Sequence, residues 1–284
     1  MTDPVFVLTI SCPDRRGIVA EVSRFLAENG CNILESQQFV DARQGRFFQR
    51  LQFASEGGLD RSRLEAAFQP IAARFAMEVQ FFDAATRTRT LIMVSRFGHA
   101  LVDLLYRNRI GSIAMEVALI VSNHRDFEDV AQASNIAFVH LPVTKETKAG
   151  QEAVLAGLIA QHRIDLVVLA RYMQVLSDEF SAARPGRIIN IHHSFLPSFK
   201  GANPYTQAYE RGVKLIGATA HYVTGDLDEG PIIEQAVERV SHTLVPEDYV
   251  AVGRDIENSV LARAIKWHCE HRIMLNGRRT VIFP

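Results

Sequence analysis

The chain has few cysteines, almost no net charge and no long apolar run, and each scarcity excludes a class of protein. Its three cysteines are an odd number without metal-site spacing, so a disulfide framework or a zinc site is disfavoured and reduced thiols in the cytoplasm are expected. A formal net charge of −1 gives no electrostatic reason to expect nucleic acid or a membrane surface as partner. No apolar run reaches membrane-span length, and the first residues are not a basic region followed by an apolar one, so we do not expect secretion.

What the chain does contain is the composition of an ordinary globular protein, with 48% hydrophobic and 22% charged residues. Its 284 residues allow two domains or one large one. Hydrophobic periodicity in the first part predicts strands and amphipathic helices in the order βαββαβ, which is the ferredoxin-like pattern. We expect this domain to occupy residues 1–83, followed by a short polar linker at residues 84–89.

A different pattern begins at residue 90 and continues to residue 284. Continuous apolar strands alternate with helical segments, which is typical of a doubly wound, mostly parallel sheet covered on both faces. Residues 215–223 and 232–240 have no helix between them, so we expect an antiparallel extension of that sheet. A long helix over residues 246–274 and a last strand over residues 280–283 are predicted to close this α/β domain.

Residues 187–197 begin as a short apolar strand and end in polar groups. Side chains alternate between the two faces of a strand, so Asn190 and His192 are predicted to point the same way, and Ile191 and His193 the other way. Open α/β sheets bind their ligands beyond the carboxyl ends of the strands. Taken alone, these residues fit a site and an ordinary strand end with two loop histidines equally well.

Residues 221–231 form the second polar segment, which is predicted to be a strand followed by an acidic loop bounded by glycines. The loop lacks the ligand spacing of an EF-hand, so calcium is not expected. Zinc held by His192, His193 and Asp228 is disfavoured because the two histidines are predicted to diverge. We therefore expect no metal, and we interpret Asp226 and Glu229 as solvated surface residues.

These two segments resemble a known family. Asn190-Ile191-His192, and Leu227-Asp228 with Gly230-Pro231 downstream, are similar to the signature of folate-dependent formyltransferases. Longer matches resemble the formyltetrahydrofolate deformylases, and they lie at residues 192–197, 204–213, 216–223 and 226–233. The resemblance extends from Pro4 to the C-terminus. It implies an N-terminal ACT domain and a formyltransferase-fold domain that hydrolyses 10-formyltetrahydrofolate to tetrahydrofolate and formate, supplying formate for purine biosynthesis.

The resemblance also assigns site residues. It implies that Asn190, His192 and Asp228 are catalytic, with His221 beside them, and that the folate substrate is bound without any further cofactor. Six residues would line the pteridine pocket: Met173, Gln174, Val175, Leu176, Val223 and Thr224.

In the N-terminal domain, the resemblance suggests an amino acid effector, glycine or methionine. Its site would lie around the start of the first helix, at Asp14, Arg15, Gly17, Ile18 and Asn32. A domain that serves only for dimerisation fits these residues equally well. Pairing of ACT domains and exposed sheet edges lead us to expect a homo-oligomer.

Two other functions remain open from the sequence. The first is formyl transfer to an amine such as glycinamide ribonucleotide. It needs a glycine-rich phosphate cradle, but residues 95–99 contain one glycine and the bulky Arg96 and Phe97, which favours water as the acceptor. The second is a non-catalytic amino acid sensor, against which the intact Asn190, His192 and Asp228 count.

Overall fold

The computed structural model describes residues 3–197 and 204–284, and the chain divides into two compact units. Unit 1 comprises Met1–Arg87, Glu270–Asn276 and Val281–Pro284, and unit 2 comprises Thr88–Cys269 and Gly277–Thr280. The division differs from the sequence-based one, which placed every residue after the linker in the second domain. Local periodicity could not show that the end of the chain returns to the first unit.

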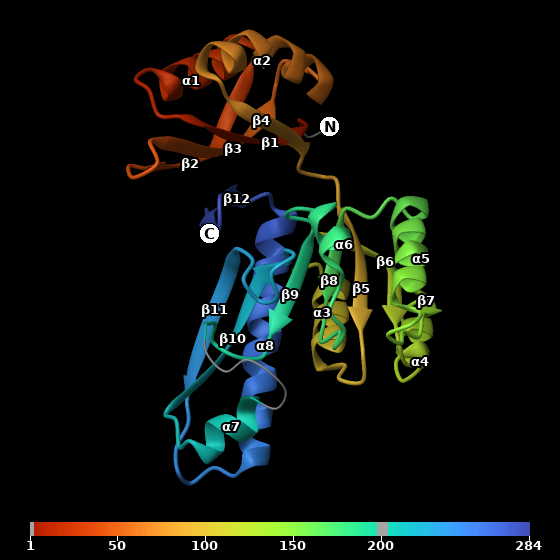
Figure 1. Ribbon diagram of the computed structural model, residues 1–284. Helices are drawn as coiled ribbons and strands as arrows, with labels where there is room; N and C mark the ends of the chain where they lie inside the picture. Colours follow the sequence, from red (N-terminus) through yellow and green to blue (C-terminus); the bar gives the residue numbers. More distant parts are fainter. Residues whose placement is uncertain (1–2, 198–203) are drawn as a thin grey trace. The chain divides into compact units, whose positions relative to one another are not determined.

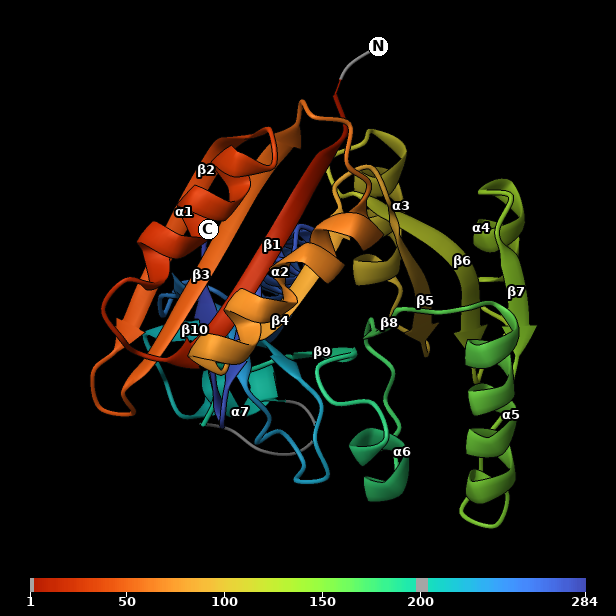
Figure 2. The same cartoon turned by 90° about the horizontal axis from the view of Figure 1, so that it is seen from above.

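Unit 1 is built on a four-stranded antiparallel sheet in the order β2-β3-β1-β4, with the predicted connectivity βαββαβ. Its elements are β1 Val5–Pro13, α1 Ile18–Glu28, β2 Cys31–Asp41, β3 Arg46–Ser55, α2 Arg61–Phe75 and β4 Glu78–Asp83. Both helices cover one face of the sheet (Figure 2). Their apolar stripes meet there, where the rings of Phe25 and Phe68 pack edge to face with centroids 5.0 Å apart.

The opposite face of this sheet holds the end of the chain. Two short strands, β12 (Ile273–Asn276) and β13 (Arg279–Ile282), follow the last helix, and Phe283 and Val281 pack on Phe48 of β3. The helix expected to reach residue 274 therefore ends at Cys269, and the segment after it is extended. Strand β12 was not predicted, because its four residues carry too little pattern to identify a strand from sequence.

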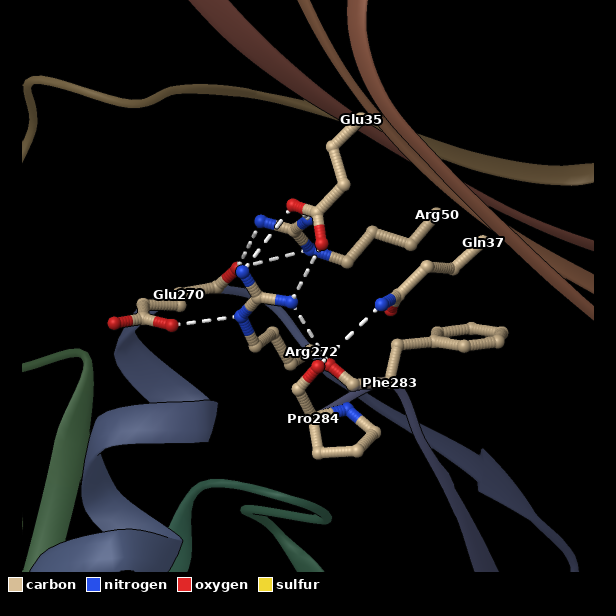
Figure 3. Close-up of polar contacts among 7 residues, drawn as sticks. All are labelled: Glu35, Gln37, Arg50, Glu270, Arg272, Phe283 and Pro284. Carbon is tan, nitrogen blue, oxygen red and sulfur yellow. Dashed lines mark hydrogen bonds and ion pairs between the residues drawn. The ribbon is translucent and has the colours of Figure 1, made fainter.

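An ion-pair cluster fixes this C-terminal segment to the sheet of unit 1 (Figure 3). The side chain of Arg50 is 2% exposed, and its Nη1 donates to Glu35 Oε2 at 2.8 Å. Its Nε and Nη2 donate to the backbone carbonyl of Glu270 at 3.2 and 3.0 Å. Arg272 donates to Glu35 Oε1 at 3.1 Å and to the carbonyl of Phe283 at 3.0 Å. The hydrogen bond from Arg272 leads the effects that hold the pKa of the Glu35 carboxyl below its ordinary value.

Replacing Glu35 with alanine should destabilise the protein, because Arg50 would stay buried without its counter-ion. We expect Glu35→Ala to lower the free energy of unfolding by about 3 kcal/mol in urea titrations at neutral pH. Glu78→Ala is the matched control, since Glu78 is 77% exposed in its pair with Arg46 and should cost about 0.5 kcal/mol. Equal losses in the two variants would contradict a structural role for the cluster. Because the pKa of Glu35 is lowered, its contribution should be present at neutral pH and disappear on acidification.

Unit 2 contains a seven-stranded sheet in the order β11-β10-β9-β8-β5-β6-β7 (Figure 1). The pairs among β7, β6, β5, β8 and β9 are parallel, and β10 and β11 extend the sheet antiparallel, as predicted. Its strands are β5 Thr88–Val94, β6 Met115–Ser122, β7 Ala137–His140, β8 Leu166–Leu169, β9 Ile188–His192, β10 Leu215–Tyr222 and β11 Ile232–Arg239. Its helices are α3 His99–Arg109, α4 Glu128–Ala133, α5 Lys148–Gln161, α6 Asp178–Ala182, α7 Pro204–Glu210 and α8 Pro246–Cys269.

Both faces of the central strands in unit 2 are buried, as their continuous apolar sequences require. Leu91 and Met93 point to one face and pack with Leu155 of α5. Helix α8 packs against β9, β10 and β11 and against α3. Among the helices of residues 3–197 and 204–284, none combines the length and the apolar character that a membrane span needs.

Candidate active site

A cavity of about 390 Å³ opens in unit 2 where β8 and β9 end. It is lined by residues 169, 171–176, 190–193, 221 and 223–228. The lining includes all three residues expected to be catalytic, the supporting histidine and all six residues expected to bind folate. Positions far apart in the sequence therefore converge on one cavity.

The sheet register explains how the polar groups reach this cavity. Asn190 and His192 are alternate residues of β9, so their side chains share one face, as predicted. In the neighbouring antiparallel strand β10, His221 lies directly opposite Asn190. Pairing of strands thus places an amide and two imidazoles together at one edge of the cavity.

Asp228 comes from the loop after β10 and completes the group. Its Oδ1 lies 3.3 Å from His192 Nδ1 and 3.6 Å from His221 Nε2. Burial would raise the pKa of the Asp228 carboxyl, but the two histidines outweigh it and hold that pKa well below its ordinary value. The loop needs Gly230, because an added Cβ would lie 1.7 Å from the carbonyl oxygen of Tyr222.

His192 has one nitrogen engaged and one available. Its Nδ1 faces the carboxylate of Asp228, while its Nε2 is buried and has no hydrogen-bond partner among the described residues. A carboxylate at one ring nitrogen fixes the orientation of an imidazole and stabilises its protonated form. The second nitrogen can therefore exchange a proton with a bound substrate.

The hydrogen bonds of His221 define its tautomer. Its Nδ1 lies 3.0 Å from the backbone carbonyl of Tyr222, so this nitrogen carries the proton. In the neutral ring, Nε2 then accepts a hydrogen bond from Asn190 Nδ2 at 3.3 Å, and in the protonated ring it can donate to Asp228 Oδ1, 3.6 Å away. This bond fixes the direction of the Asn190 amide, whose second hydrogen remains available for a substrate oxygen.

The expectation that His192 and His193 diverge is wrong. Strand β9 ends at His192, so alternation does not extend to the next residue, and the two rings stack with centroids 5.1 Å apart. Desolvation and the nearby Arg171 lower the pKa of His193 to about 4, so its imidazole is neutral at physiological pH. In the described residues, no group of three or more His, Cys, Asp or Glu side chains is placed to hold a metal. Glu229 is exposed, as expected, and pairs with Arg278 at 3.1 Å.

The segment from Tyr172 to Ser177 forms one wall of the cavity and is held in place from α5. Gln151 Nε2 donates to the hydroxyl of Tyr172 at 2.8 Å. Glu152 of the same helix holds the other end of the segment. Its carboxylate accepts hydrogen bonds from the backbone N–H of Ser177 at 2.7 Å and from the Ser177 hydroxyl at 2.5 Å. The backbone N–H of Met173 donates to Ser95 Oγ at 3.0 Å. The wall is therefore anchored at both ends, and its apolar side chains line the cavity.

Neutralising Glu152 should weaken substrate binding without removing the chemistry. In Glu152→Gln one of the two acceptor oxygens becomes a donor, so a charge-assisted bond worth about 2 kcal/mol is lost at Ser177. We expect KM for the folate substrate to rise by roughly tenfold, with a much smaller change in kcat. Glu179→Gln, on the exposed side of α6, is the control and should leave KM unchanged. A fall in kcat alone would contradict the anchoring role.

Sequence reasoning missed one cationic residue of the lining, Arg171. It lies two residues after the end of β8 and adopts a left-handed backbone conformation with φ 63°. Its side chain is 11% exposed, and its Nε lies 3.4 Å from Glu257 Oε2. An arginine placed immediately after a buried apolar strand was the available signal.

The residues expected to bind an effector lie in unit 1, where the turn before α1 exposes Asp14 and Arg15. Gly17 has φ 93° and precedes the helix, which suits a residue without a Cβ. Ile18 is 2% exposed and belongs to the core, so its side chain is not available to a ligand. Asn32 is exposed on β2.

The fold and the cavity of unit 2 define a formyl transferase domain, joined to a ferredoxin-like domain of the ACT type. Residues 88–265 match the formyl transferase family, and residues 6–68 match the ACT domain. A formyltetrahydrofolate deformylase of Corynebacterium sp. is 50% identical over 277 residues, which is 97% of each protein. The crystal structure of a formyltetrahydrofolate deformylase from Burkholderia mallei is 52% identical, with a TM-score of 0.95 over 99% of this chain and 100% of that one. The chain belongs to the formyltetrahydrofolate deformylases, a family of enzymes.

The structural likeness to amine formyltransferases is partial. A glycinamide ribonucleotide transformylase from Symbiobacterium toebii is 32% identical, with a TM-score of 0.65, and the match covers 70% of this chain and 95% of that one. An amine formyltransferase is therefore the less favoured alternative for this chain.

Proposed function

We propose that the chain hydrolyses 10-formyltetrahydrofolate to tetrahydrofolate and formate. The observation that carries the proposal is the convergence of Asn190, His192 and Asp228 on one cavity, which apolar side chains of residues 173–176 also line. An apolar slot with a few directed polar groups suits a flat heterocycle such as a pteridine. The amide, imidazole and carboxylate supply what the hydrolysis of a formamide requires.

The geometry favours His192 as the group that moves protons. Asp228 has a lowered pKa, so it is a weak base, but it holds His192 through Nδ1. His192 Nε2 would take a proton from water as the water oxygen attacks the formyl carbon. The Asn190 amide would donate to the oxyanion that forms, a contribution typically worth about 3 kcal/mol. The C–N bond then breaks, and His192 returns the proton to the folate nitrogen.

Incubation of the purified protein with 10-formyltetrahydrofolate alone tests this function. Equal amounts of tetrahydrofolate and formate should appear with no acceptor present. If the substrate is consumed only when glycinamide ribonucleotide is added, the chain is an amine formyltransferase. If neither condition consumes it, the domain serves as a non-catalytic sensor.

We further propose that unit 1 binds a small amino acid effector, glycine or methionine, near Asp14, Arg15, Gly17 and Asn32. The turn with its exposed polar groups lies at the start of α1, where helix amides favour an anionic carboxylate. Calorimetry and rate measurements with each amino acid test this proposal. Absence of both heat and rate change would assign unit 1 a purely structural role.

The remaining proposals concern the setting of the enzyme. Strand β2 is at an edge of its sheet and exposes Leu34, Phe39 and Val40, which supports assembly into a homo-oligomer. Light scattering coupled to gel filtration gives the oligomeric mass.

The three cysteines are buried and suit a reducing cytoplasm, where released formate would supply purine synthesis.

A further inference from the structure

We infer that Arg171, held by Glu257, is the specificity-determining residue that restricts the formyl acceptor to water. This inference rests on the proposed hydrolysis and names the group that makes it selective. Arg171 lines the catalytic cavity, but it is neither one of the three residues expected to be catalytic nor one of the six expected to bind the pteridine. With His193 neutral, Arg171 contributes the positive charge to that part of the lining.

The backbone at Arg171 is in an unusual conformation for an arginine. Its φ of 63° is in the left-handed region, which is sterically unfavourable for a residue with a Cβ. A hydrogen bond from the N–H of Ser95 to the carbonyl of Arg171, at 3.3 Å, holds this turn against the end of β5. Glycine would adopt the same conformation without strain, so the sequence carries an arginine here at a cost in stability.

The side chain of Arg171 is buried without full hydrogen bonding. Among the described residues, its Nε and Nη1 are buried and have no hydrogen-bond partner. Its guanidinium carbon lies 5.7 Å from the ring centroid of Phe97, and Arg254 lies 6.0 Å from the same ring. Burying a cation with unpaired donors is unfavourable, so its retention beside a reaction site points to a role in the reaction.

Glu257 on α8 is the group that keeps the guanidinium in place. Its side chain is 1% exposed, and Oε2 faces both Arg171 Nε and, at 2.8 Å, His99 Nε2. Its Oε1 accepts from the hydroxyl of Tyr205 at 2.7 Å. A carboxylate fixed on both oxygens is rigid, and it therefore positions the cation at the cavity wall.

The consequence is selection among acceptors by charge and by volume. An amine acceptor arrives mainly as a cation, which Arg171 repels, and it needs room that the guanidinium occupies. Water is neutral and small enough to enter. In hydrolysis a C–O bond forms, the C–N bond to folate breaks and a proton of water passes to the folate nitrogen. With an amine, the cation first loses a proton to solvent. The neutral amine then forms a C–N bond to the formyl carbon, the C–N bond to folate breaks, and one amine proton passes to the folate nitrogen.

Removing the Arg171 side chain should convert part of the hydrolysis into formyl transfer to an amine. The purified full-length Arg171→Gly variant and the wild type are incubated with 10-formyltetrahydrofolate and glycinamide, and formate and N-formylglycinamide are quantified by NMR. The ratio of formylated amine to formate should rise by about tenfold or more in the variant, a typical discrimination for one pocket contact. Arg254→Ala is the matched control, because it removes the other cation at Phe97 but lies outside the cavity lining, and its ratio should equal that of the wild type.

Arg171→Gly leaves the buried Glu257 without its cation and could prevent folding. The double variant Arg171→Gly with Glu257→Gln removes both charges and carries the test in that case. An unchanged product ratio in the folded variant overturns the inference, while formate release by the wild type still supports hydrolysis. If the wild type releases no formate, the proposed function fails instead.

Discussion

Replacement of Asp228 by asparagine is expected to lower kcat by about 10³–10⁴ while the folate substrate still binds. The carboxylate oxygen next to His192 Nδ1 stabilises the imidazolium that forms when His192 takes a proton from water. An asparagine side chain can face His192 through its N–H₂ group and favour the wrong tautomer. It also supplies no negative charge, so the proton transfer loses its electrostatic support.

Asp228→Asn should change the reaction without changing the fold of the loop. Asp228 has φ 57°, and asparagine is among the residues that tolerate the left-handed region best. The loop around it should therefore keep its shape. Steady-state kinetics give kcat, and equilibrium titration with the product tetrahydrofolate gives the affinity, which should stay within about threefold of the wild type. Asp255→Asn, at an exposed position on α8, should change neither quantity. A kcat for Asp228→Asn near that of the wild type would remove Asp228 from the mechanism.

The parts of the structure that follow from local pattern could be predicted from the sequence. Alternation within β9 placed Asn190 and His192 on one face, and continuous apolar strands indicated a sheet covered on both sides. The order βαββαβ followed from periodicity and turn residues. The convergence of Asp228 with these residues did not follow from periodicity. It was expected only because residues 226–231 resemble those of a family.

Features that depend on tertiary packing were beyond the sequence. His193 lies one residue past the end of β9, where the alternation rule stops, and so it stacks on His192. The return of residues 270–276 to unit 1 depends on an ion pair of Arg272 with Glu35, 237 positions earlier, and on a hydrogen bond from Arg50 to the Glu270 carbonyl, 220 positions later. Arg171 was missed because its place after an apolar strand was the one local signal, and its left-handed backbone, which favours glycine or asparagine, could not be read from the sequence.

Asn190→Leu should lower kcat by about 10²–10³ with little change in KM, because the amide is expected to act on the oxyanion and not on the bound substrate. Leucine has the same branching and number of side-chain heavy atoms as asparagine, so it leaves no cavity in the half-buried position. The amide has a second partner, His221 Nε2 at 3.3 Å, so a loss of activity has two explanations. Asn190 either stabilises the oxyanion or merely orients His221.

A double-variant comparison separates these two roles of Asn190. If the amide only orients His221, then His221→Gln should lower kcat as much as Asn190→Leu does, and the double variant should lose no more than either one. If the amide holds the oxyanion, Asn190→Leu should cost about 3 kcal/mol whether or not His221 is present, and the two losses should nearly add. We expect the second result, since one hydrogen of the Asn190 amide engages His221 and the other is left for the developing negative charge.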